Sequence, residues 1–107
     1  MRSCTEFISL HENTLGVAGY CYGCESFHLK MKGLLSVVSD VQLGVIEENL
    51  VQMQFNLETQ QLNDPSVGVQ IKITENTFLC LSYDEVIEAL ELIEMANYMK
   101  KINDLVL

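Results

Sequence analysis

The fold is decided by one stretch, FHLKMKGLLSVVSDVQ, residues 27–42. Its first residues alternate, with Phe27, Leu29 and Met31 separated by polar side chains, which predicts a strand with one buried face. A glycine then permits a tight turn into a second apolar segment, residues 34–38. Ser39 followed by Gln42 fits the capping box that starts a helix. The stretch therefore predicts two antiparallel strands that lead directly into a helix.

The same order of signals recurs near the C-terminus. Val67, Val69, Ile71 and Ile73 alternate with polar residues, a Glu-Asn-Thr turn follows at residues 75–77, and Ser82 with Glu85 forms a second capping box. Another Glu-Asn-Thr turn, at residues 12–14, predicts an additional N-terminal hairpin. We expect a single domain over residues 1–107, with internal similarity between about 27–55 and 67–103. The predicted class is α+β, a mostly antiparallel sheet with two helices on one face, in the order ββ-ββα-ββα.

The two predicted helices differ in how much apolar surface they carry. The first is expected over about residues 40–55 and contains Gly44, which weakens a helix unless close packing needs it. Its expected core stripe is Val41, Val45, Ile46, Leu50 and Met53. The second is expected over about residues 83–103. Its apolar side chains are Val86, Ile87, Ala89, Leu90, Leu92, Ile93, Met95, Ala96 and Met99. So wide an arc either lies between the sheet and the first helix or forms a homodimer interface.

Composition excludes several classes of partner. The net charge is −9, from 15 acidic and 6 basic residues, so a phosphate backbone would be repelled and we expect no nucleic-acid binding. No apolar run reaches the roughly 20 residues of a membrane helix, and the first residues do not resemble a signal peptide. We therefore expect a cytoplasmic protein with no membrane partner. Hydrophobic residues make up 49% of the chain, which allows a homodimer through the second helix or the open sheet face.

The chemically distinctive motif is a C-x-x-C, Cys21-Tyr22-Gly23-Cys24. This spacing can direct two thiolates at one zinc ion. If the first hairpin turns at Glu12-Asn13, Cys4 lies opposite Cys21 and becomes a candidate third ligand. His28 is a possible fourth ligand, although the strand would have to bend. Structural zinc, a redox dithiol and a tight turn with inert thiols remain alternatives.

The other chemistry-bearing residues have simpler interpretations. Cys80 lies in an apolar run and is expected to be buried. Neither histidine has a plausible nucleophile at a matched position, so no catalytic triad is predicted. Glutamates on both predicted helices fit solvated faces. We expect no enzymatic activity.

Several motifs together resemble a small bacterial family of unknown function. They are Cys4, the Glu12-Asn13 turn, the C-x-x-C and the run Phe27-His28-Leu29 leading to Gly33-Leu34. The resemblance spans nearly the whole chain and implies a cytoplasmic bacterial protein with no known activity. A metal-binding member would carry a second ligand beside Cys4, which this chain lacks.

These observations favour a non-enzymatic interaction or regulatory module that forms a homodimer. The first alternative is a small zinc-binding domain that uses the C-x-x-C. The second is a thiol redox protein.

Overall fold

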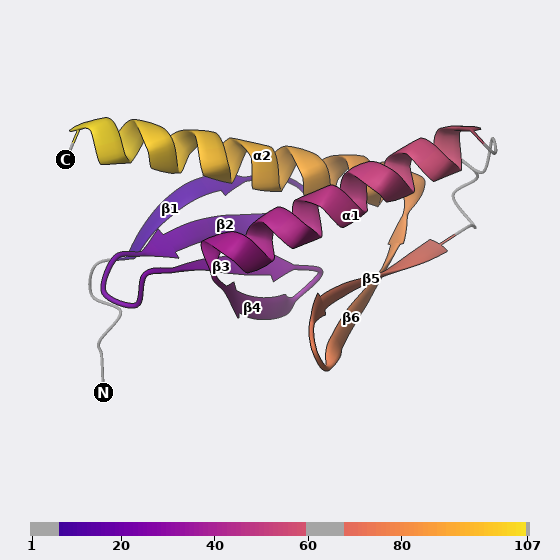
Figure 1. Ribbon diagram of the computed structural model, residues 1–107, viewed down its shortest axis with the longest axis horizontal. Coiled ribbons are helices and arrows are strands. Elements are labelled where there is room, and N and C mark those ends of the chain that lie inside the picture. The colour runs from indigo at the N-terminus through magenta and orange to yellow at the C-terminus, as the bar shows by residue number, and fades with distance from the viewer. Residues whose placement is uncertain (1–6, 60–67, 107) are drawn as a thin grey trace.

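The order of strands and helices agrees with the sequence prediction. A computed structural model describes residues 7–59 and 68–106 (Figure 1). Within these ranges the elements are β1 (Phe7–Glu12), β2 (Gly16–Cys21), β3 (Ser26–Met31), β4 (Leu34–Val38), α1 (Asp40–Thr59), β5 (Gly68–Thr74), β6 (Thr77–Ser82) and α2 (Tyr83–Val106). The α+β class and the order ββ-ββα-ββα are confirmed. Both helices continue a few residues beyond their predicted ends.

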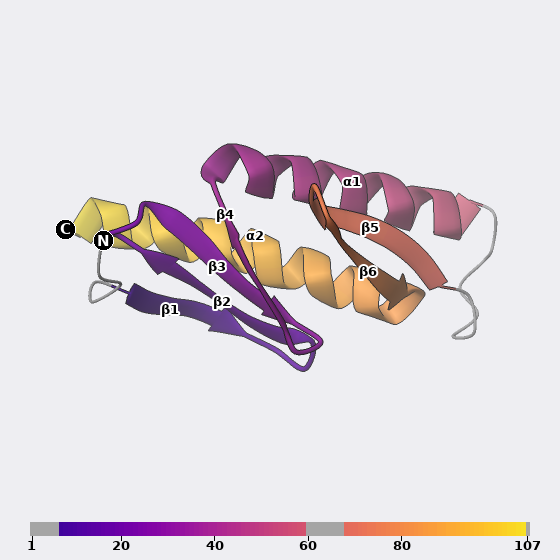
Figure 2. The ribbon, with the colours of Figure 1, turned by 90° about the horizontal axis from the view of Figure 1, so that it is seen from below.

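The strands form two sheets where we expected one. β1, β2, β3 and β4 pair in that order, while β5 and β6 form a separate hairpin, and every pair is antiparallel. Between β4 and β5 the chain passes along α1, whose 20 residues span about 30 Å. The second hairpin consequently begins far from the end of β4 and does not pair with it. Figure 2 shows both sheets in front of both helices, so the helices cover one side of each sheet.

Local signals explain how each helix and turn begins. Ser39 N–H donates to Gln42 Oε1 at 2.9 Å, and Gln42 N–H donates to Ser39 Oγ at 3.2 Å. Ser82 and Glu85 exchange the same pair of bonds at 2.9 and 3.3 Å. Both predicted capping boxes are therefore present, and each satisfies donors that a helix N-terminus leaves open. The β3–β4 turn consists of Lys32 (φ 53°) and Gly33 (φ 83°), as a two-residue hairpin requires.

The core lies between the strands and the helices. The buried alternation of β3 is as predicted, and in β5 Ile71 and Ile73 are buried; Val67 lies outside the described residues. The prediction for α1 was partly wrong, because Val41 is 78% and Val45 51% exposed. The buried side chains of α1 are Leu43, Ile46, Leu50 and Leu57. Apolar residues occur on two faces of this helix, so its apolar pattern does not decide which face packs on the strands.

The wide apolar arc of α2 is used within the chain. This helix packs against β1, β2, β6 and α1. Its buried side chains are Val86, Ala89, Leu90, Leu92, Ile93 and Ala96. The position between sheets and first helix, one of our two interpretations, accounts for these buried side chains, while Ile87 of the same arc is 38% exposed. None of the described helices is both long and apolar enough to cross a membrane.

Candidate functional site

The C-x-x-C motif forms the turn between β2 and β3. Cys21 ends β2 and is fully buried, and Cys24 is half-buried within the turn. The backbone N–H of Cys24 donates to Cys21 Sγ at 3.4 Å, and Glu25 completes the turn with a φ of 53°. The turn therefore places the backbone of Cys24 against the sulfur of Cys21.

Among the described residues, no third predicted ligand joins the two cysteines of this turn in a metal-binding cluster. Cys21 pairs with Phe7, so the register that placed Cys4 opposite it was wrong. Asn13 is the first residue of the β1–β2 turn and not its centre, since Asn13 Oδ1 accepts from the N–H groups of Leu15 and Gly16 at 3.0 and 3.2 Å. Cys4 itself lies outside the described residues. Across residues 7–59 and 68–106, no cluster of three or more His, Cys, Asp or Glu side chains could hold a metal ion.

His28 lies on the side of the four-stranded sheet turned away from the helices. It pairs with Gly19 on β2 and with Val37 on β4. Its ring packs against Phe7, with ring centroids 5.3 Å apart. Its Nε2 is buried and finds no hydrogen-bond partner among the described residues. An aromatic contact thus replaces water on one side of the ring.

Large apolar side chains are exposed on that same side, which we call the outer sheet face. It includes Phe7 on β1 and Leu35 on β4. It also includes Gly19, His28 and Val37, which are partners across β2, β3 and β4. Leu35 is 59% and Val37 51% exposed. A Cβ added to Gly19 would overlap the Phe7 ring, so this ring lies directly over β2. No other described element lies in front of this face in Figure 2.

Sequence reasoning named the open sheet face as a candidate interface but did not identify its exposed apolar side chains, although β4 carried the signal. Residues 34–38 were treated as one apolar run, but Ser36 and Val38 are the ones turned inward and buried. The side chains between them must point outward because a strand alternates. The hairpin β5–β6 shows the same effect, since Leu81 is buried while Cys80 is exposed. Our prediction of a buried Cys80 was wrong for that reason.

Charge divides between the two layers. The strand segments, residues 7–38 and 68–82, carry Glu12, Glu25 and Glu75 against three lysines, and have no net charge. The two helices together carry ten acidic residues against Lys100 and Lys101, a net charge of −8. Nearly all of the excess negative charge of the described chain therefore lies on the helices.

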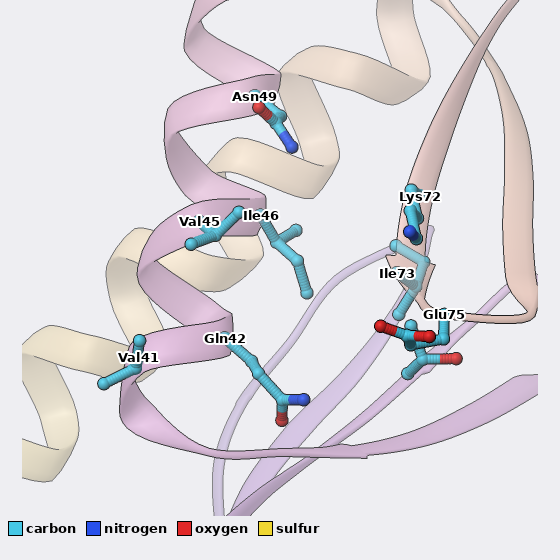
Figure 3. Close-up of a pocket in the computed structure, with 9 residues that line it drawn as sticks. Val41, Gln42, Val45, Ile46, Asn49, Lys72, Ile73 and Glu75 are labelled. Carbon is cyan, nitrogen blue, oxygen red and sulfur yellow. The ribbon is translucent and has the colours of Figure 1, made fainter.

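A cleft of about 290 Å³ opens between α1 and β5 (Figure 3). Ile46 and Ile73 line it, together with Gln42 and Asn49. Figure 3 shows Gln42, Ile46 and Asn49 projecting from α1 toward β5. Lys72 and Glu75 add one charge of each sign. No histidine or cysteine lines this cleft, so its described residues lack the imidazole and thiolate ligands that are typical of zinc sites.

A polar cluster attaches the end of α2 to β2 beside the cysteine turn. Lys100 Nζ lies 4.5 Å from the centre of the Tyr20 ring and 2.8 Å from Asp104 Oδ2. Tyr22 O–H donates to Asp104 Oδ1 at 2.8 Å. The hydrogen bond from Lys100 lowers the pKa of Asp104, and the bond to Asp104 raises the pKa of Tyr22. The Lys100–Asp104 pair lies one helical turn apart, but the contacts of Tyr20 and Tyr22 with α2 join residues about 80 positions apart, so sequence spacing gave no sign of them.

A second polar cluster joins the first hairpin to α2. Asn13 Nδ2 donates to the carbonyl oxygen of Glu88 at 2.9 Å, and His11 Nε2 lies 2.6 Å from Glu91 Oε1. The hydrogen bond with His11 lowers the pKa of Glu91. Both glutamates therefore serve in contacts between the hairpin and the helix. Lys32 forms a third link, since its Nζ donates to the carbonyl oxygen of Cys80 at 3.1 Å and to Glu85 at 3.2 Å.

Comparisons with protein-family models, with curated proteins and with solved structures find no match to this chain.

Proposed function

We propose that this chain is a non-enzymatic interaction module that forms a homodimer through the outer sheet face. The observation that carries the proposal is the exposure of Phe7, Leu35 and Val37 on one uncovered side of the sheet. Contiguous apolar surface with no cover inside a chain commonly marks a site of association. Burying each such side chain contributes on the order of 1–2 kcal/mol.

The charge distribution favours a second copy on this face. Two strand layers have no net charge, so two copies that meet through them repel each other less than copies that meet through their helix layers. Two helix layers would bring net charges of −8 and −8 together, and like charges oppose association. Sheets also pack face to face at about 10 Å through interleaved side chains. The alternative interface through α2 is favoured less, because most of the apolar arc of that helix is buried within the chain.

Sedimentation velocity at micromolar concentration tests this proposal. We expect the native chain to sediment as a dimer and the double variant Leu35→Thr/Val37→Thr to sediment as a monomer. Threonine keeps the β propensity of these positions, so the sheet should persist. The matched control is Val41→Thr/Val45→Thr, which removes similarly exposed side chains from α1 and should leave the dimer intact. A native chain that is monomeric throughout, or a control that dissociates as readily as the test variant, rejects the interface.

A zinc-binding domain is the second candidate. It is supported by the hydrogen bond from the Cys24 N–H to Cys21 Sγ, since such donors stabilise the thiolates that zinc requires. Cys4, outside the described residues, stays the predicted third ligand. Elemental analysis of untagged protein purified without chelator tests this function. Near one equivalent of zinc, lost in Cys24→Ser and retained in Cys80→Ser, supports it, and less than about a tenth of an equivalent rules it out.

A further inference from the structure

Two depressions lie along one side of α1. The first, about 430 Å³, lies between α1 and α2 and is lined by Glu47, Glu94, Asn97, Tyr98 and Lys101. A neighbouring depression of about 240 Å³ is lined by Val51, Gln54, Phe55 and Glu58. Glu47, Val51, Gln54 and Glu58 recur at the spacing of one helix face, so the two depressions follow the same side of α1. We call them together the helix groove.

The two helices remain neighbours along this length. α1 and α2 run in opposite directions (Figure 2), and the end of α1 meets the start of α2. Burial and then the Glu58 carboxylate raise the pKa of Tyr83, the first residue of α2, which places the two side chains close together. From Glu47 to Glu58 the groove extends about 17 Å at the rise of an α-helix. This length matches three turns of a helical segment.

Apolar side chains are exposed along the helix groove. Val51 is 51%, Phe55 61% and Tyr98 58% exposed. Single exposed apolar residues are common on protein surfaces. Here, however, Val51 and Phe55 lie one helical turn apart, and Tyr98 lines the neighbouring depression. Anchors with this spacing are what an amphipathic helix meets when it binds in a groove.

Charge decides which occupant fits. The carboxylates of Glu47, Glu58 and Glu94 line the helix groove, against Lys101 alone. A second copy of this chain would present helices of the same strong negative charge. We propose that the helix groove docks a basic amphipathic helix of a partner protein. Its apolar side covers Val51, Phe55 and Tyr98, and its lysines or arginines approach the three glutamates.

This surface is distinct from the one proposed for the homodimer. The helix groove lies on the helix layer and the outer sheet face on the strand layer, so one chain can engage both. Docking is therefore measurable in a chain that fails to dimerise, and the two proposals stand or fall separately.

A designed peptide tests docking directly. The probe is an 18-residue, N-acetylated and C-amidated peptide of leucine and lysine with one tryptophan, its leucines at the spacing i, i+3, i+4, i+7. The chain contains no tryptophan, so the peptide's fluorescence reports binding without interference. The comparison peptide has the same composition with the leucines scattered. We expect the amphipathic peptide to bind at least fivefold more tightly than the scattered one, with an affinity that falls as salt is raised.

Two exposed phenylalanines provide matched variants. Phe55→Gln, in the helix groove, should weaken the amphipathic peptide at least fivefold. Phe78→Gln, on the exposed side of β6, should leave its affinity unchanged. Glu47→Gln/Glu94→Gln should weaken binding and reduce its salt dependence. Equal binding of the two peptides, or equal affinities for Phe55→Gln and Phe78→Gln, would show attraction by charge alone and overturn the proposal.

Discussion

Gly44→Ala should make this protein more stable. Gly44 lies near the start of α1, and a Cβ added there meets no atom within 4 Å. Glycine inside a helix costs about 0.5–1 kcal/mol relative to alanine, because it loses more backbone freedom on folding. At Gly44 no steric overlap would offset the stability gained from alanine. We therefore expect the free energy of unfolding to rise by about 0.5–1 kcal/mol and Tm by a few degrees, at about 4–8 °C per kcal/mol.

Urea unfolding followed by circular dichroism measures this change. The transition midpoint should rise while the slope stays the same. The matched control is Gly16→Ala on β2, where a Cβ would overlap the backbone carbonyl of Lys30. Backbone atoms cannot move aside as the end of a side chain can. The free energy of unfolding of this variant should therefore fall by about 1–3 kcal/mol or more. A loss of stability in Gly44→Ala would refute the placement of that residue. A weakened dimer in Gly44→Ala would show that α1, and not the outer sheet face, carries the contact.

Two further substitutions follow from the polar contacts. Asn13→Ala removes both the turn bonds to Leu15 and Gly16 and the bond to the Glu88 carbonyl, so we expect a loss of about 1–3 kcal/mol in urea unfolding. Asn76→Ala, at the exposed equivalent turn, should lower the free energy of unfolding by less. Equal losses in the two variants would contradict the stabilising role assigned to the contacts of Asn13. The bond from the Ser82 N–H, followed by contacts with Lys32, lowers the pKa of Glu85 below its ordinary 4.5. A lowered pKa stabilises the fold above that ordinary value, and the contribution is lost as pH falls through the lower, folded-state pKa. The stability difference between the native chain and Glu85→Gln should therefore shrink between about pH 6 and pH 3, and a difference that is constant over this range would count against the contact.

Features that depend on near neighbours could be predicted from sequence. Each capping box, at Ser39 and at Ser82, involves only four consecutive residues, and both boxes are present. The alternation of Phe27, Leu29 and Met31 correctly identified a strand and its buried side. In these cases the physical cause acts over a few residues, so the sequence contains it.

Features set by contacts between distant segments could not be predicted in this way. α1 carries apolar residues on two faces, and only its packing against strands and α2 decides that Leu43 is buried and Val41 exposed. The register of β1 against β2 depends on Asn13 acting as the first residue of its turn, and on an irregularity between Ser9 and His11. The separation of β5 and β6 from the other strands depends on where α1 ends.

The sequence suggested the open sheet face as an interface, but the side chains that form it became visible only in the structure. Leu35 and Val37 belong to an apolar run whose two faces the sequence does not separate. The concentration of acidic residues on the two helices could be read from the sequence, but their separation from the strand layer appears only when α1 and α2 are placed on one side of both sheets.

Sedimentation equilibrium of the unmodified chain at two ionic strengths tests the central claim most directly. Association through the outer sheet face brings together surfaces without net charge, so salt should change its strength little. We predict a mass of about twice 12.1 kDa at roughly 50 mM and 500 mM salt alike. A mass of 12.1 kDa at both ionic strengths, or a dimer that forms only at high salt, would contradict the account.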